Sequence, residues 1–342
     1  MPAPGSLRVR AQSRLGRHQA AWDALGTRQP IPTPFQRSWW LEGVGPTDTT
    51  YLLVLDDDRL VGGIALREAR LAGVRRLVAP GPLVLCPDHL DLMAQPGAEG
   101  EVVAAVAHWL GRPGQRLLDV RGLVADSLLA RAAGTAAAPA DVAPYEPLPA
   151  PPEDFLSGRS SNFRRSVRRS TRRLAGLGFE HRRVTAEGLP EAVASFRSLQ
   201  DDRDGRGPLV AALPTLARAL TAGVAAGEAR VDVLASDDEV IAASFAFVVA
   251  GRLSLYQVAR SLEAEHDGAG TALLAAVIED AVAAGCVEVD LLRGGEGYKS
   301  SFADATRQVM RLRAARGGVA RAQLSAEDAA RRVSARLRSR VP

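Results

Sequence analysis

The sequence predicts a mixed α/β fold (α+β, with a mixed sheet) made of two tandem copies of one unit, on two observations. The first is a repeated hairpin: an apolar strand, an acidic turn and a second apolar strand follow one another over residues 51–66, and the same plan returns over 231–249. The second is that each hairpin is followed, further along the chain, by a helix and then a strand. With 342 residues and 46% hydrophobic content, the chain can bury large cores, and its length favours two domains of about 150 residues each.

The helix and strand after each hairpin also match between the copies. Residues 100–110 have helical spacing and lead into an apolar strand over 117–122, and residues 270–280 lead into another over 287–294. Both strands end in an Arg-Gly pair. An internal duplication explains this order.

A proline-rich stretch divides the copies. Residues 132–152 are rich in alanine and proline, and X-Pro steps disfavour helix, so we interpret the stretch as a linker. We therefore expect an N-terminal domain over 1–140, a C-terminal domain over 141–313, and an Arg/Ala-rich helix within 314–342 that begins near Ser325.

The second domain is expected to contain further helices and one more strand. Helical patterns cover 159–176, 190–203 and 213–227, and apolar residues alternate over 253–259 as in a strand.

Several classes of protein are disfavoured by composition. We see no secretory signal and no apolar run of about 18 residues, so we expect a cytoplasmic protein with no membrane span. Cys86 and Cys286 lie far apart in apolar contexts, which favours reduced thiols. The five histidines lack metal-binding spacing, and we expect no metal.

The helix expected over 159–176 carries a dense row of arginines. They recur in pairs every four residues, so one wide face of the helix is basic. The row is either a solvated surface or a site for a polyanion such as a tRNA backbone, and we place Arg165 and Arg169 among the candidate substrate-binding residues. The arginines are Arg164, Arg165, Arg168, Arg169, Arg172 and Arg173.

A glycine pair precedes the helix over 270–280. Gly268, Ala269, Gly270 and Thr271 could leave backbone amides free at a helix N-terminus, where a phosphate binds well. An ordinary glycine-rich turn is the alternative.

Lys299 is the only lysine; the other 42 of the 43 basic residues are arginine. It lies in a loop just after the strand over 287–294, close to Arg293. Two cations at the carboxyl end of a core strand suggest a site for an anionic ligand group.

The order of hairpin, strand, Gly-x-Gly turn, helix, strand and tyrosine-containing segment resembles the GNAT acyltransferases. The basic helix, the Asp290-Leu-Leu-Arg-Gly segment and the Tyr298-Lys-Ser-Ser-Phe302 segment resemble more closely the CelD/BcsL-like branch, which is similar in architecture to the tandem FemABX peptidyltransferases. The resemblance covers about 145–313 well and the first half loosely.

The resemblance implies two tandem GNAT-like domains, acetyl-CoA or another acyl-CoA as cosubstrate, and a pyrophosphate cradle at residues 268–271. The FemABX likeness implies aminoacyl-tRNA as the alternative donor. Two residues depart from the family pattern: Glu265 stands where GNAT proteins have Arg or Gln, and Ser301 stands where many have glycine. An inward-facing Glu265 would repel a pyrophosphate.

Acyl transfer to an amine needs a base, oxyanion stabilisation and an acid for the leaving group. Tyr298 is the candidate acid, and Glu296 and Asp290 are candidate bases. Substrate binding is expected from a set of polar side chains that could equally serve packing or surface ion pairs. They are Lys299, Arg293, Tyr256 and Gln257.

The sequence therefore predicts a GNAT-type acyltransferase. The acceptor would be the amine or hydroxyl of a small molecule, glycan or peptide, bound between the domains and carrying an anionic group. A FemABX-like aminoacyl-tRNA-dependent amide ligase is one alternative, and a non-catalytic GNAT-like protein that binds a glycan or a partner is another.

Overall fold

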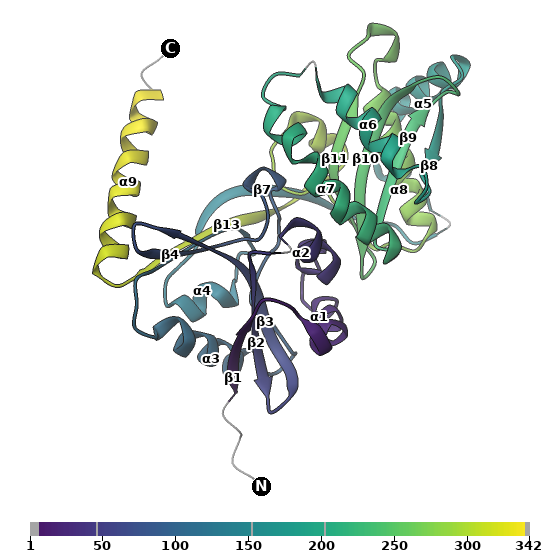
Figure 1. Ribbon diagram of the computed structural model, residues 1–342. Helices are drawn as coiled ribbons and strands as arrows, with labels where there is room; N and C mark the ends of the chain where they lie inside the picture. The colour runs from purple at the N-terminus through teal and green to yellow at the C-terminus, as the bar shows by residue number, and fades with distance from the viewer. Residues whose placement is uncertain (1–6, 46, 152, 202, 339–342) are drawn as a thin grey trace.

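The computed structural model describes residues 7–338 apart from 46, 152 and 202, and in this range the strands form one continuous sheet. The sheet has 13 strands in the order β1-β2-β3-β4-β6-β13-β7-β12-β11-β10-β9-β8, with β5 paired to β3 beside this path. Figure 1 shows a half at each end of the sheet, joined through β7 and β13.

The N-terminal half begins with an antiparallel meander, and its fourth strand pairs in parallel with β6. Helices α1 and α2 lie on one side of these strands and α3 and α4 on the other (Figure 1). Its elements are β1 Arg8–Gln12, α1 Gln19–Gly26, α2 Ser38–Val44, β2 Thr49–Asp56, β3 Arg59–Leu71, β4 Val74–Val78, β5 Met93–Ala94, α3 Glu99–Gly111, β6 Arg116–Leu123 and α4 Leu128–Ala133.

The C-terminal half repeats this plan. Strands β8 to β11 are antiparallel, and β11 pairs in parallel with β12. Helices α5 and α8 pack on one face and α6 and α7 on the other, each with its own set of buried apolar side chains. Its elements are α5 Ser161–Gly176, β8 Glu180–Arg183, α6 Leu189–Asp201, α7 Gly207–Ala225, β9 Ala229–Ala235, β10 Val240–Val249, β11 Arg252–Arg260, α8 Ala269–Ala283 and β12 Glu288–Asp290.

The two halves exchange strands at the centre of the sheet. Strand β7, Ala138–Pro147, follows the N-terminal half in the chain but pairs antiparallel with β12 of the C-terminal half. Strand β13, Ala305–Arg316, follows β12 but pairs antiparallel with β6 of the N-terminal half. The exchanged strands also pair with each other. Neither half therefore has a complete sheet without a strand from the other.

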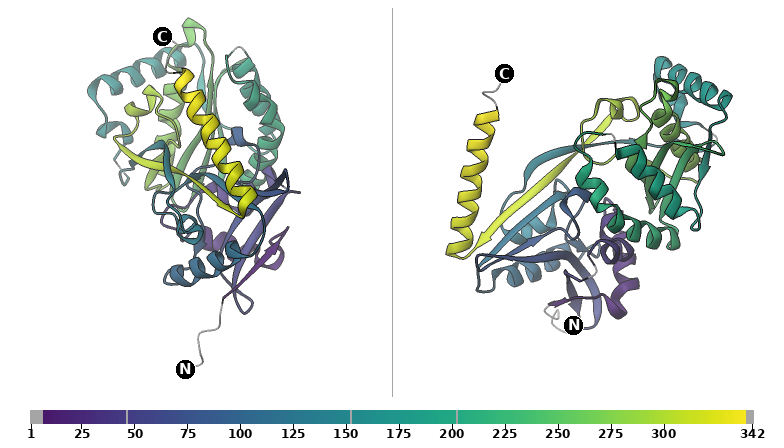
Figure 2. Two further views of the ribbon diagram at one scale, coloured as in Figure 1. Left: turned by 90° about the vertical axis from the view of Figure 1, so that its left-hand side faces the viewer. Right: turned by 45° about the horizontal axis from the view of Figure 1, so that its top comes forward.

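The expected linker over 132–152 is wrong, because β7 lies within it. Proline removes a donor but keeps its carbonyl, and Pro144 O still accepts a hydrogen bond from Leu291 N at 2.9 Å. The boundary expected at 140/141 falls inside β7, and the one at 313/314 falls inside β13. The last helix, α9, spans Gly318–Arg338 and begins before Ser325; Figure 2 shows it beside the end of β13, projecting away from both halves.

The remaining expected helices and strands are present, most with ends shifted by one to three residues. Helix α7 begins at Gly207, well before the expected 213, and β3 continues to Leu71, beyond the expected 66. Another exception is the strand over 287–294, which contains only Glu288–Asp290. It ends there because Leu292 has a left-handed backbone, with φ of 55°, and its N–H bonds to the side chain of Asp290 at 2.8 Å.

Helix α7 is the one described helix with the length and composition to cross a membrane. In the fold it serves as a core helix, because it packs closely on α2 of the other half. A Cβ added at Gly43 of α2 would lie 2.5 Å from Ala219 Cα, and one added at Gly223 would lie 3.0 Å from the Trp39 ring. An ion pair between Arg37 Nη2 and Glu228 Oε1, at 2.7 Å, joins the residue before α2 to the turn after α7.

Gly43→Ala should therefore destabilise the protein by about 1–3 kcal/mol, because the added methyl group meets backbone that cannot move alone. Gly100→Ala is the matched control: it also lies in a helix, but nothing lies within 4 Å of its added Cβ, and it should stabilise by at most about 1 kcal/mol. Denaturant unfolding of both variants tests this. Equal midpoints for Gly43→Ala and the wild type would contradict the close helix contact.

Candidate functional site

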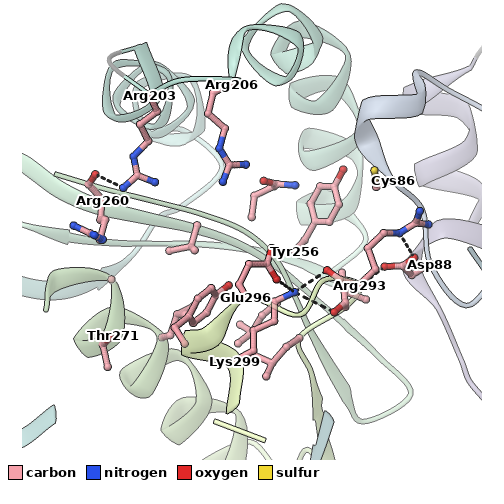
Figure 3. A pocket seen from close by; sticks show the side chains of 18 of the residues that line it. Cys86, Asp88, Arg203, Arg206, Tyr256, Arg260, Thr271, Arg293, Glu296 and Lys299 are labelled. Atoms are coloured by element: carbon pink, nitrogen blue, oxygen red, sulfur yellow. Dashed lines mark hydrogen bonds and ion pairs between the residues drawn. The ribbon is translucent and has the colours of Figure 1, made fainter. Parts of the chain in front are cut away.

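A cavity of about 590 Å³ lies between the two halves, at the carboxyl ends of β11 and β12. The C-terminal half contributes most of its wall, and Val84, Cys86 and Asp88 of the N-terminal half close one side (Figure 3). Its volume is within the range of roughly 300–1,000 Å³ that small-molecule sites occupy. We take it as the candidate active site.

The cavity exists because two parallel strands separate. β11 and β12 pair only from Arg252–Ser254 to Glu288–Asp290, and the residues that follow in both strands line the cavity. Tyr256 is an extra residue in β11, since the register to β10 shifts there. Such a bulge bends a strand and is common beside active sites.

The N-terminus of α8 faces this cavity without a side-chain cap, and Gly268, Gly270 and Thr271 line the wall there. Gly268 has φ of 81°, and a Cβ on it would lie 2.3 Å from Ser170 Oγ, so only glycine fits. Ala269, the first residue of α8, is fully buried. Uncapped amides and a helix dipole of this kind favour a bound phosphate.

Three arginines line the cavity next to this helix end: Arg203, Arg206 and Arg260 (Figure 3). None of them forms an ion pair with a carboxylate in the described ranges. Arg203 Nη2 donates to Arg260 O at 3.4 Å, and burial, followed by the charges of Arg260 and Arg206, lowers the pKa of Arg203. Clustered cations beside free amides form an anion-binding pocket.

The sequence interpretation missed these three arginines. Arg203 and Arg206 border a loop between two expected helices, and Arg260 follows the strand expected over 253–259 by one residue. An arginine directly after a strand and before a glycine turn was the available signal.

Glu265, which departs from the family pattern, does not line the cavity. Its exposed carboxylate lies 3.9 Å from His266 Nε2, and its backbone carbonyl accepts a hydrogen bond from Arg173. It therefore does not oppose an anion in the cavity.

The arginine row lies on the solvent face of α5, opposite the buried Val167 and Leu174. Arg165 and Arg169 are exposed, do not line the cavity and have no ion pair among the described residues. Only the end of the row reaches the site: Arg173 also donates to Asp267 O in the turn before α8.

Lys299 lines the cavity, but its ammonium group bonds within the protein. The side chain is 6% exposed, and Nζ contacts Leu292 O at 3.1 Å, Arg293 O at 2.7 Å and Glu296 Oε2 at 2.9 Å. All three donors are in use, so Lys299 holds the loop after β12 in shape. The expected role of Lys299 in binding an anionic ligand group stays a prediction.

Glu296 and Tyr298 lie in the loop that Lys299 holds, and both line the cavity. Burial alone would raise the pKa of Glu296, but the hydrogen bond from Lys299 lowers it below its usual value, so the carboxylate is ionised at neutral pH. Burial and the charge of Glu296 raise the pKa of Tyr298 to about 12. The phenol keeps its proton at all ordinary pH values.

Arg293 and Tyr256 connect the two halves across the cavity wall. Arg293 Nε donates to Asp88 Oδ1 at 2.6 Å, and its Nη2 donates to Pro87 O at 2.6 Å. Tyr256 donates from its hydroxyl to Leu85 O at 2.6 Å and packs on Phe35 and other aromatic rings, while Gln257 beside it lines the cavity.

Asp290 lies apart from the cavity lining. It is fully buried, its Oδ2 lies 2.8 Å from His89 Nε2, and it accepts a hydrogen bond from Arg307 at 3.1 Å. Burial alone would raise its pKa, but His89 and Leu292 N–H lower it. The expected role as a base does not fit these surroundings, and Asp290 holds the strand end instead.

The first half has no equivalent of the anion pocket at its corresponding helix. Glu99 and Glu101 lie in the first turn of α3, where they oppose a bound anion. Within the described residues, the cavity with uncapped helix amides and clustered arginines therefore lies on the C-terminal half.

Two groups of side chains have metal-like spacing among the described residues: His181, Asp232 and Asp280, and Glu239, Glu263 and His266. In the first group Arg230 donates to both carboxylates at 2.7–3.2 Å, which leaves little charge for a cation.

These features define a tandem GNAT fold of the FemABX type, and comparison with known proteins agrees. Residues 161–300 match the family described as "Acetyltransferase (GNAT) domain". A search of curated proteins with this sequence gives no match.

Solved structures resemble the chain over nearly its whole length. FemX has a TM-score of 0.63 at 10% identity, covering 86% of this chain and 95% of its own. The C-terminal domain (DUF2156) of a putative lysylphosphatidylglycerol synthetase from Agrobacterium fabrum has 0.56 at 12%, covering 91% and 95%. A tandem GNAT protein from the clavulanic acid biosynthesis pathway has 0.53 at 15%, covering 91% and 99%. At these identities the likeness establishes the fold.

Lys299→Met should lower the stability of the ligand-free protein by about 1–3 kcal/mol, because two buried carbonyls lose their donor. Glu296→Gln, which changes only the exposed partner, should cost less than about 1 kcal/mol. Thermal unfolding without ligand compares them. If Lys299→Met unfolds like the wild type and loses only ligand binding, the ammonium group contacts a ligand after all.

Proposed function

We propose that the protein transfers an acyl group from acetyl-CoA or another acyl-CoA to the amine of an acceptor bound in the cavity between the halves. The observation that carries this proposal is the meeting of Arg203, Arg206 and Arg260 with the uncapped N-terminus of α8 on one wall of the cavity. A diphosphate fits this surface, since it needs both backbone donors and compensating charge.

The arrangement orients the donor. With its phosphates at Gly268, Gly270 and the arginines, a pantetheine chain would run along the gap between β11 and β12 toward Tyr298. The N-terminal loop with Cys86 and Asp88 then faces the acceptor side.

The reaction forms a bond from the acceptor nitrogen to the thioester carbonyl carbon and breaks the carbon–sulfur bond. The amine loses one proton, and the leaving thiolate gains one. Tyr298 is the donor of the second proton, since its phenol is neutral up to a pKa of about 12. Glu296, ionised beside it, binds and orients the acceptor amine and accepts the proton that the amine loses.

An anionic group on the acceptor stays a prediction from the sequence, because Arg206 is assigned to the phosphates of the donor. The relation to the CelD/BcsL-like branch, a glycan or peptide acceptor and a cytoplasmic location stay predictions from the sequence.

One observation favours a second donor, an aminoacyl-tRNA. The exposed arginines of α5 end beside the cavity. Arg173 donates a hydrogen bond to Asp267 O in the turn before α8, and Ser170 packs against Gly268. A nucleic acid backbone along this face would bring its end to the same pocket. Both acyl donors would bind in the cavity, but only the tRNA would also contact the arginine row of α5.

Substitutions in the two places separate these donors. Arg260→Ala and Arg203→Ala should each weaken acetyl-CoA binding roughly 10- to 100-fold, the effect of losing a charge-assisted hydrogen bond. The double change Arg165→Ala and Arg169→Ala should leave acetyl-CoA binding unchanged, and Arg218→Ala, an exposed arginine of α7, is the matched control. Titration calorimetry measures each.

Charged tRNA, titrated in parallel, gives the other outcome. Binding of tRNA with no binding of any acyl-CoA, lost in the Arg165/Arg169 variant, would replace the proposal with the second donor. Binding of neither would favour a non-catalytic protein.

Tyr298→Phe should lower kcat by roughly 10²–10⁴ with little change in acetyl-CoA affinity, since it removes only a proton donor. Because the pKa of Tyr298 is about 12, the wild-type rate should show no loss from tyrosine ionisation as pH rises to about 10. Activity against pH with a broad set of amines measures both. A falling limb near pH 8 that disappears in the variant would contradict this role.

A further inference from the structure

A second, smaller cavity lies in the N-terminal half and shares no lining residue with the larger cavity. It has a volume of about 170 Å³ and lies where the end of α3, the start of β6, the end of α4 and the junction of β13 with α9 meet. Three arginines line it, with a wall of small apolar side chains. The lining includes Leu110, Arg116, Ala133, Ala315, Arg316 and Arg321.

Arg116 is a buried charge with an unused donor. The residue is 7% exposed, and its Nε has no hydrogen-bond partner. Nη1 donates to Leu110 O at 2.6 Å, and the guanidinium lies 5.1 Å from the centre of the Trp109 ring. Neither contact supplies negative charge, and a buried cation without a counter-charge is costly.

The surroundings of Arg116 add positive charge. Arg316 and Arg321 are exposed and form no ion pair within the described ranges. The carboxylate that acts on Arg116, Glu68, is itself held by a two-point contact with Arg75. Burial is the main cause that lowers the pKa of Arg116, and the charges of Arg75 and Arg316 lower it further. This direction is expected of a cation that lacks a counter-charge.

We propose that this cavity is a second binding site, for a small oxyanion held by Arg116, Arg316 and Arg321. The anion offsets the charge of the buried guanidinium. The volume admits a phosphate, or a carboxylate on a short aliphatic body against Ala133 and Ala315. The bound anion would fasten the end of β13 and the start of α9 to β6 and α3.

The test is titration calorimetry of the full chain with inorganic phosphate and, separately, with butyrate. Arg260→Ala serves as the background, because it weakens anion binding in the larger cavity. On that background one binding event should remain. Arg116→Met and Arg321→Ala should each weaken it at least tenfold, and Arg218→Ala should change it less than twofold.

The responses also identify the ligand's charged group. Binding heat with phosphate but not with butyrate supports a phosphate ligand. A higher affinity for butyrate than for phosphate supports a carboxylate ligand. If Arg116→Met fails to fold, the exposed Arg321 decides. Absence of binding by both anions, or an affinity that changes less than twofold in Arg321→Ala and in a folded Arg116→Met, would overturn the proposal.

Discussion

The antiparallel pair β7–β13 is the constraint on which the rest of the structure depends. Because β13 also pairs with β6 and β7 also pairs with β12, the two halves share one sheet and cannot turn independently. That fixed relation brings the loop with Asp88 against Arg293 and closes the large cavity. Ion pairs reinforce it, since Arg307 of β13 binds both Glu288 and Asp290 of β12.

Arginine has two distinct uses in this chain. Along the central strands it is paired: Arg311 binds Asp119 through two nitrogens, and Asp119 has its pKa lowered to about 2 even though burial alone would raise it. At the large cavity Arg203 and Arg260 lack such partners among the described residues. Where a carboxylate lies near it, an arginine in this chain forms an internal ion pair. Where none does, as at the large cavity, its charge stays available to a ligand.

Much of the fold could be predicted from the sequence, because the repeated hairpins and helices are local patterns. The strand exchange could not, since pairing of β13 with β6 joins residues about 190 apart and leaves no local trace. The prolines of β7 also pointed to a linker. Lys299 stood out by composition and does lie at the cavity, but its bonds to Leu292 and Arg293 carbonyls depend on the loop's folded shape.

The strand exchange has a consequence for synthesis on the ribosome. Strand β13 is translated after every other described strand of the sheet, yet it fills the place beside β6, which is made much earlier. Until then β6 presents an unpaired edge, and the first half cannot close its sheet. The usual order, in which an N-terminal unit folds as it emerges, is therefore unavailable to this protein. Its final assembly must wait until β13 has been made, and the exposed edge needs protection during translation.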